Sequence, residues 1–175
     1  MKSFKKFMSV ALVASMALSF TGCGKSFKAI NKKDFEKGLK AIKLDDDMLE
    51  YEDERVSSFL YDDAEYAAMV TDDDQMYMFI EFEDEEAAKE CFEEEFYEDL
   101  EDALEDEEFD GKESHKLKKT SGYIIINGDN EEEGDVYGGI YLKDNIMVVA
   151  LAHSTKKSDK KDVDAFLKEI GYPKP

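Results

Sequence analysis

One stretch of the sequence decides the fold, Ile146-Met147-Val148-Val149-Ala150-Leu151. Side chains alternate between the two faces of a strand, so a run that is apolar at every position predicts a strand buried on both faces, at the centre of a sheet. The preceding residues, Lys143-Asp144-Asn145, supply a tight turn, because Asp and Asn tolerate a positive φ. We therefore expect residues 146–153 to form a hairpin with residues 136–142.

Three further strands are expected outside this hairpin. Residues 122–127 contain three consecutive isoleucines, which favour a strand. Residues 66–71 and 76–82 are two apolar runs, and the residues between them, 72–75, are Asp-Asp-Asp-Gln. Two such runs around a short polar segment predict a second hairpin with an acidic turn.

Apolar residues at helical spacing predict the helices. The first helix begins after a cap at Asn31, and the last is capped by Ser158 and ends at Gly171. The longest covers residue 83 to about residue 104, and its apolar face consists of Ala88, Cys91, Phe92, Phe96, Leu100 and Leu104. Residues 45–63 fit either a short helix or an extended crossing.

These elements define one domain. Its length, residues 31–175, suffices to bury a single core. We predict an acidic α+β domain in which an antiparallel sheet of about five strands is packed with two to three helices.

The first 22 residues have the pattern of a secretory signal peptide. Lys2, Lys5 and Lys6 precede a run from Phe7 to Phe20 that is almost wholly apolar or small. As a helix this run reaches only about two-thirds of the ~30 Å hydrocarbon core of a membrane. We therefore expect residues 1–22 to be removed rather than to span the membrane.

The leader ends in Ser19-Phe20-Thr21-Gly22-Cys23-Gly24, which resembles the lipobox of bacterial lipoproteins. Thr21, Gly22 and Cys23 match that motif, and Phe20 stands where the family usually has Leu. The resemblance implies that Cys23 is lipidated as the first residue of the mature chain, and that residues 23–30 are a lipidated N-terminus and a short tether. Two acyl chains would hold the protein durably on the outer face of the cell membrane. An ordinary signal peptide that leaves Cys23 free is the alternative.

The net charge limits the partners. Without residues 1–22, which hold three lysines and no acid, the formal net charge changes from −21 to −24. Such a net charge repels nucleic acid and anionic lipid headgroups, so we expect no nucleic-acid partner. If Cys23 is lipidated, Cys91 has no partner within the chain, and we expect a small buried hydrophobe at that position rather than a reactive thiol.

No motif predicts a catalytic site or a cofactor. His115 and His153 lack the spacing of a zinc chelate. Residues 127–135 contain alternating oxygen donors and two glycines that permit a tight turn. They are the best candidate for a calcium loop, although they do not fit an EF-hand. The carboxylates on the outer face of the longest helix favour either solvation or contact with a basic protein.

The sequence therefore predicts a non-enzymatic, lipid-anchored protein outside the cytoplasm, with a binding or scaffolding role. A module that binds or senses a divalent cation is the first alternative. A small hydrolase is the second, and it would require a concave pocket that gathers His115, His153 or a serine with carboxylates.

Overall fold

The structure is a computed structural model that describes residues 27–52, 61, 63–72, 74–98, 100, 109–130 and 134–175. The expected signal peptide, Cys23 and the first part of the expected tether, up to residue 26, lie outside the described residues.

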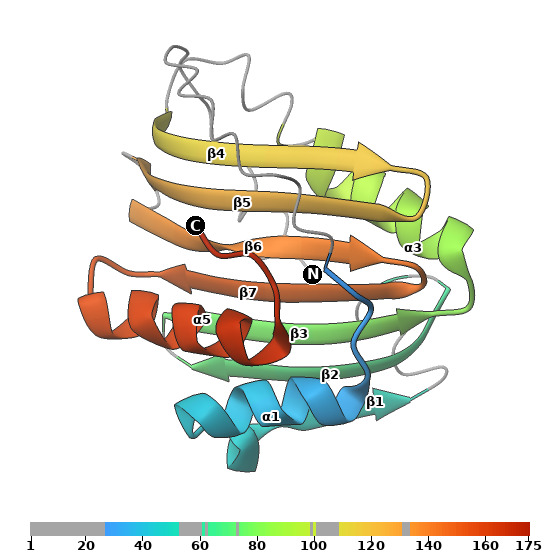
Figure 1. Ribbon diagram of the computed structural model, residues 1–175, viewed down its shortest axis with the longest axis horizontal. Coiled ribbons are helices and arrows are strands. Elements are labelled where there is room, and N and C mark those ends of the chain that lie inside the picture. The colour runs from blue at the N-terminus through green and yellow to red at the C-terminus, as the bar shows by residue number, and fades with distance from the viewer. Residues whose placement is uncertain are drawn as a thin grey trace.

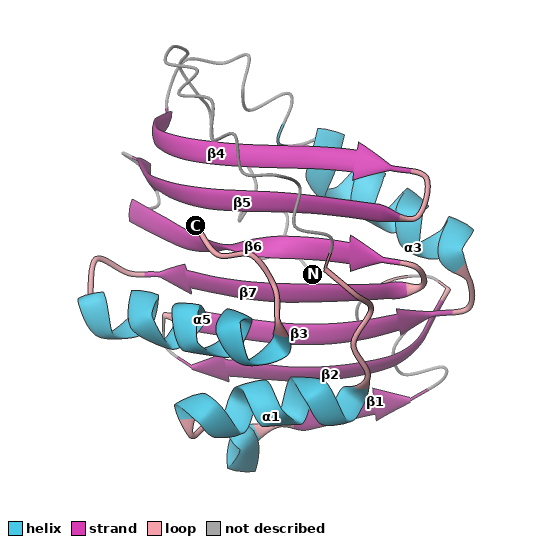
Figure 2. Ribbon diagram, viewed as in Figure 1, coloured by secondary structure: helices cyan, strands magenta, loops and turns pink. Residues whose placement is uncertain are grey.

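The described residues form one antiparallel sheet (Figures 1 and 2). Its strand order is β1-β2-β3-β7-β6-β5-β4. The strands are β1 (Leu49–Glu52), β2 (Ala64–Asp72), β3 (Gln75–Phe82), β4 (Phe109–Lys118), β5 (Ser121–Asn130), β6 (Gly134–Lys143) and β7 (Ile146–His153). The α+β class and the antiparallel sheet are confirmed.

The expected number of about five strands was too low, because the described part of the chain contains seven. The two additional strands, β1 and β4, are the edges of the sheet. An edge strand contributes little to the core and so carries a weak apolar pattern. Strand β1 has only four residues, and most side chains of β4 are exposed, so neither has the alternation by which the other strands were predicted.

Strand β7 lies at the centre of the sheet between β3 and β6, as its uniformly apolar sequence predicts. The turn before it has Asp144 at φ 57°, which agrees with the expected positive φ. On the neighbouring strand Gly138 has φ 145°, and a Cβ there would lie 2.0 Å from the carbonyl oxygen of Ala150. Only glycine allows the two strands to approach this closely.

Helices cover both faces of the sheet, as Figure 1 shows. Helices α1 (Lys32–Ile42) and α5 (Lys157–Ile170) pack on one face. Helix α3 (Glu85–Phe92) packs on the other face and continues into the π-helical turn η2 (Glu93–Tyr97). The segment that fitted either a short helix or an extended crossing contains a 3₁₀ turn η1 (Asp45–Asp47) and β1; its residues 53–60 and 62 lie outside the described range.

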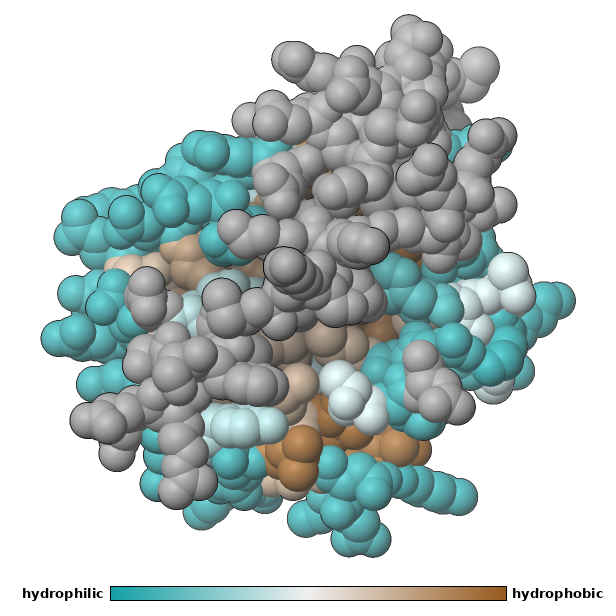
Figure 3. Space-filling view, turned by 180° about the vertical axis from the view of Figure 1, so that it is seen from behind, coloured by the Kyte–Doolittle hydropathy of each residue, from teal (hydrophilic) through white to brown (hydrophobic). Residues whose placement is uncertain are grey.

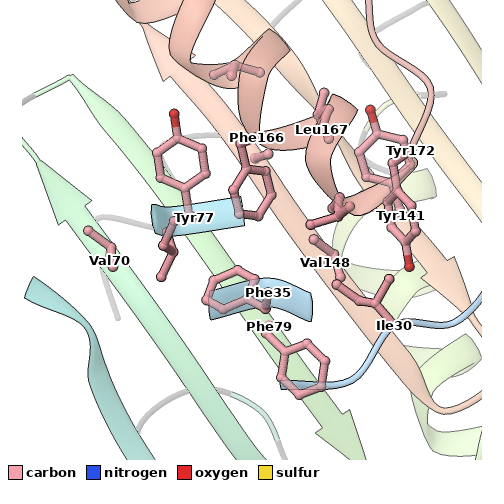
Figure 4. Packing of buried hydrophobic residues seen from close by; sticks show 14 of the residues in the cluster. Ile30, Phe35, Val70, Tyr77, Phe79, Tyr141, Val148, Phe166, Leu167 and Tyr172 are labelled. Carbon is pink, nitrogen blue, oxygen red and sulfur yellow. The ribbon is translucent and has the colours of Figure 1, made fainter. Parts of the chain in front are cut away.

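Aromatic rings fill the layer between the sheet and helices α1 and α5 (Figure 4). The ring of Phe166 lies 4.8 Å from that of Tyr77 and 5.5 Å from that of Phe35, measured between centroids. The two helices meet at Gly38, where a Cβ would lie 2.6 Å from the Phe166 ring. The final segment returns to the sheet, because the Tyr141 hydroxyl donates a 2.6 Å hydrogen bond to the carbonyl of Pro173.

The helix ends test the predicted caps. Asn31 accepts a 3.2 Å hydrogen bond from the backbone N–H of Asp34, and Gly171 has the left-handed conformation, with φ 77°. Both caps are confirmed. Ser158 is not a cap, because α5 begins one residue earlier and the Ser158 hydroxyl donates to Asp159 instead. Within the described residues, no helix is both long and apolar enough to cross a membrane.

Candidate functional site

Helix α3 divides its residues between the sheet and solvent. The Asp84 carboxylate caps the helix, accepting hydrogen bonds from the backbone N–H groups of Glu86 (2.8 Å) and Ala87 (2.9 Å). The buried residues of α3 and the turns that follow are Ala88, Phe92, Phe96 and Leu100, all of which belonged to the predicted apolar face. The helix begins at Glu85, two residues later than expected, and Leu104, at its expected end, lies outside the described residues.

The outer side of α3 forms an open groove of about 880 Å³. Among the described residues it is lined by seven acids and two lysines: Asp84, Glu85, Glu86, Glu90, Glu93, Glu94, Glu98, Lys89 and Lys119. We call this the acidic groove. Figure 3 views the molecule from the side on which α3 lies, and much of the surface that the described residues form there is hydrophilic. The groove is therefore a negatively charged concave surface.

Four exposed glutamates recur at every fourth residue along this side: Glu86, Glu90, Glu94 and Glu98. We call them the glutamate ladder. Residues four apart on a helix are neighbours, and like charges at that spacing repel each other. Lys89 offsets part of this repulsion, because it forms an ion pair with Glu93. The remaining carboxylates favour association with a cation or a basic surface.

Cys91 lies on the same helix and is half-buried against the core. Burial, together with the nearby charges of Glu95 and Glu94, raises the pKa of its thiol far above the ordinary value. A thiol that stays protonated is a poor nucleophile. The structure thus gives Cys91 the chemistry of a small hydrophobic residue, as the sequence predicts.

The two histidines lie apart. His115 is on the edge strand β4, where its Nδ1 lies 2.8 Å from Glu113 Oε2 and its ring makes an edge contact with Tyr97. His153 ends β7, and burial lowers its pKa, with an opposing effect of Asp74. Because β5 and β6 separate these strands, the strands themselves are about 14 Å apart across the sheet. The register places His115 in line with Val149, and His153 lies four residues, about 13 Å, further along β7. The described residues that line the acidic groove include neither histidine.

The candidate calcium loop lies at the tip of the β5–β6 hairpin. Asp129 and Asp135 are opposite each other in the register of these strands, while residues 131–133 lie outside the described range. The Asp135 carboxylate lies 3.0 Å from Lys160 Nζ of α5. Among the described residues, no group of three or more His, Cys, Asp or Glu residues is placed to hold a metal ion.

One residue of the acidic groove comes from outside the helix and was not predicted. Lys119 reaches the groove from the turn between β4 and β5. It was not predicted there, because β4 itself was not predicted and the turn therefore had no assigned place. The sequence signal that could have indicated this turn is the pair of lysines at 118 and 119, which follows the polar residues of β4.

Comparison with known proteins gives one weak likeness. No protein-family model matches the chain, and no curated protein matches it. Among solved structures it is similar to the crystal structure of the extracellular domain of PknH from Mycobacterium tuberculosis, with a TM-score of 0.37 and 7% sequence identity over 81% of this chain and 92% of that chain. A TM-score of 0.37 does not establish a common fold, so the proposals below depend on the residues of this chain alone.

Proposed function

We propose that this protein is a lipid-anchored domain of the cell envelope that binds a basic partner protein through the acidic groove. The observation that carries the binding role is the composition of that groove, whose described lining has seven acids against two lysines on one concave surface. The proposed location is supported by the resemblance of residues 19–24 to a lipobox, which implies lipid on Cys23. The role is non-enzymatic and requires no cofactor.

The electrostatics favour a basic protein as the partner. An extended surface of one charge raises the rate at which an oppositely charged partner associates, and this effect weakens as salt rises. The groove is also large enough to accept side chains, since ligand sites commonly have volumes of about 300–1,000 Å³. A lysine-rich or arginine-rich segment therefore fits both its charge and its shape.

The anchor is tested in the full-length protein expressed in a bacterium. Mass spectrometry of the mature chain should show an N-terminus at Cys23 carrying a diacylglyceryl group. Cys23→Ser should abolish the modification and move the protein from the membrane fraction to the soluble exported fraction. An intact Met1, or a mature chain without acyl groups, would contradict the proposed location.

The binding role is tested with a defined cationic probe, oligolysine, and the lipidated protein in neutral vesicles. The variant Glu90→Gln/Glu94→Gln should weaken binding several-fold at low salt. A matched control, Glu65→Gln/Glu169→Gln, removes the same charge from exposed positions on β2 and α5. Equal losses in both variants would mean that the probe senses net charge alone, and the groove would lose its role.

A divalent-cation module is the second candidate function. It is favoured by the register that sets Asp129 opposite Asp135 across the β5–β6 hairpin. Oxygen ligands of this kind suit calcium. Calcium should then raise the melting temperature, and the Asp129→Asn/Asp135→Asn variant should show a smaller rise, because only the contribution of the glutamate ladder remains. A rise of equal size in the variant would place calcium elsewhere and remove this candidate.

A further inference from the structure

Strand β4 carries a row of lysines on one face. Lys112, Lys116 and Lys118 alternate along the strand, and Lys116 lies opposite Tyr123 of β5 in the register. Tyr123 packs against the core on the side of α1 and α5. Residues opposite each other in neighbouring strands share a face, so the three lysines lie on that side as well. We call them the β4 lysine row.

The charges of this row are available to a partner. All three lysines are exposed, and no described residue forms an ion pair with any of them. Of the acidic residues nearby, Glu113 alternates to the opposite face, whereas Asp110 lies on the same face two residues before Lys112, so Lys116 and Lys118 lie furthest from it. Helices α1 and α5 lie over the other part of the sheet in Figure 1. A basic surface of this kind is unusual in a chain of net charge −21.

The start of the described chain lies close to the same face. The ring of Phe27 packs 5.7 Å from that of Tyr141 and 4.7 Å from that of Tyr172, measured between centroids. Tyr141 lies opposite Tyr123, which in turn lies opposite Lys116. Two strand spacings, about 10 Å, therefore separate Tyr141 from Lys116.

The length of the tether sets how far the lipid can be from this row. Four residues lead from Cys23 to Phe27, and a fully extended chain of that length spans at most about 14 Å. A lipid on Cys23 therefore lies within about 14 Å of Phe27. This reach is comparable to the distance of about 10 Å between Tyr141, which Phe27 contacts, and Lys116 of the β4 lysine row. The exposed Lys28, next to Phe27, adds a further positive charge to this region.

We infer that the β4 lysine row rests on anionic lipid headgroups of the membrane that holds the acyl chains, and that it thereby fixes the orientation of the domain. This inference depends on the proposed lipidation of Cys23. The acidic groove lies on the opposite face of the sheet, against α3. The same orientation therefore directs the groove away from the like-charged membrane and towards a partner.

The experiment measures which lysines the membrane protects. The lipidated full-length protein is inserted into vesicles of phosphatidylcholine alone or mixed with anionic phosphatidylglycerol, and a membrane-impermeant amine reagent labels it before peptide mass spectrometry. Labelling of the β4 lysine row should fall several-fold on anionic vesicles at low salt and recover at high salt. Lys40 and Lys43 are exposed at the end of α1, which packs near the other edge of the sheet, and should label equally on both vesicles.

A variant separates the charge from the anchor. On anionic vesicles each lysine near the surface contributes about a fivefold change in affinity. Lys112→Gln/Lys116→Gln/Lys118→Gln should therefore transfer between anionic vesicles about 100-fold faster than the unmodified sequence, with no change on neutral vesicles. The matched control, Lys40→Gln/Lys43→Gln/Lys161→Gln, removes three exposed lysines at the end of α1 and on α5 and should transfer at the original rate.

The outcomes distinguish this inference from the proposed function. If mass spectrometry finds no acyl group on Cys23, the anchor itself is wrong and both proposals fall. If Cys23 is acylated but the β4 lysine row labels equally on both vesicles, the anchor stands and the orientation is overturned. Equal acceleration in the two triple variants would also overturn it, because the effect would then follow total charge.

Discussion

Removing one charge from the glutamate ladder should stabilise the domain. Glu90 has ladder neighbours on both sides, Glu86 and Glu94, at a spacing of four residues. Each like-charged pair at this spacing destabilises a helix by about 0.2–0.5 kcal/mol. Glu90→Gln removes both pairs and keeps a side chain of similar size and helix propensity. We expect the free energy of unfolding to rise by about 0.4–1 kcal/mol at low salt.

The assay is thermal unfolding followed by circular dichroism. For a chain of this length, about 1 kcal/mol raises the melting temperature by ~2–4 °C, so we expect an increase of about 1–4 °C. High salt screens exposed charges and should abolish most of the gain. The control is Glu65→Gln, on an exposed position of β2 outside the ladder. A melting temperature that does not rise, or a rise that persists unchanged in high salt, would refute repulsion along the ladder.

Four further changes test other parts of the structure. Gly138→Ala should lower the free energy of unfolding by about 2–4 kcal/mol in urea denaturation, because its Cβ would meet the Ala150 carbonyl at 2.0 Å. Tyr141→Phe should cost about 1 kcal/mol and speed amide exchange in the C-terminal segment, since it removes a 2.6 Å hydrogen bond. Hydrogen bonds, chiefly from Ser154, lower the pKa of Asp159 in the folded protein. The ionised carboxylate therefore stabilises the fold above the unfolded-state pKa near 4, and this contribution is lost as the pH falls through the folded-state pKa. Asp159→Asn should flatten the loss of stability below about pH 4. Millimolar calcium should raise the melting temperature by screening the repulsion between the ladder carboxylates, and a flat response would remove the idea.

The sequence predicts the centre of this fold better than its edges. The run at residues 146–151 specifies a central strand, because both of its faces must be covered by apolar groups. The stripes of α1, α3 and α5 were also recognised, since each buries a row of side chains. Strands β1 and β4 were missed because their pairing depends on backbone hydrogen bonds to a neighbour rather than on an apolar pattern of their own.

The candidate site was predicted only where it depends on the spacing of residues within one segment of the chain. The carboxylates of the acidic groove belong to one helix, so helical spacing alone brings them together. Lys119 comes from a turn whose position depends on the pairing of β4 with β5, which local sequence does not specify. The cap at Ser158 was wrong, because its hydroxyl binds Asp159 and leaves the first turn of α5 without a side-chain cap.

The register between β4 and β5 separates the two charged surfaces of the molecule. Leu117 lies opposite Gly122, and a Cβ on Gly122 would lie 2.8 Å from the ring of Phe92, so α3 packs closely on that face. The adjacent residue Lys116 points to the other face, beside Tyr123. A slip of one residue would exchange the faces, placing lysines under the acidic helix and Leu117 in solvent.

Gly122→Ala, which pushes against Phe92, should therefore disturb the packing of α3 while leaving the core around Phe166 intact. The near-ultraviolet circular dichroism of aromatic residues on the α3 side should weaken while the strand content stays unchanged. Loss of both the aromatic signal and the strand content would show that the layer of α1 and α5 depends on the contact between Gly122 and Phe92.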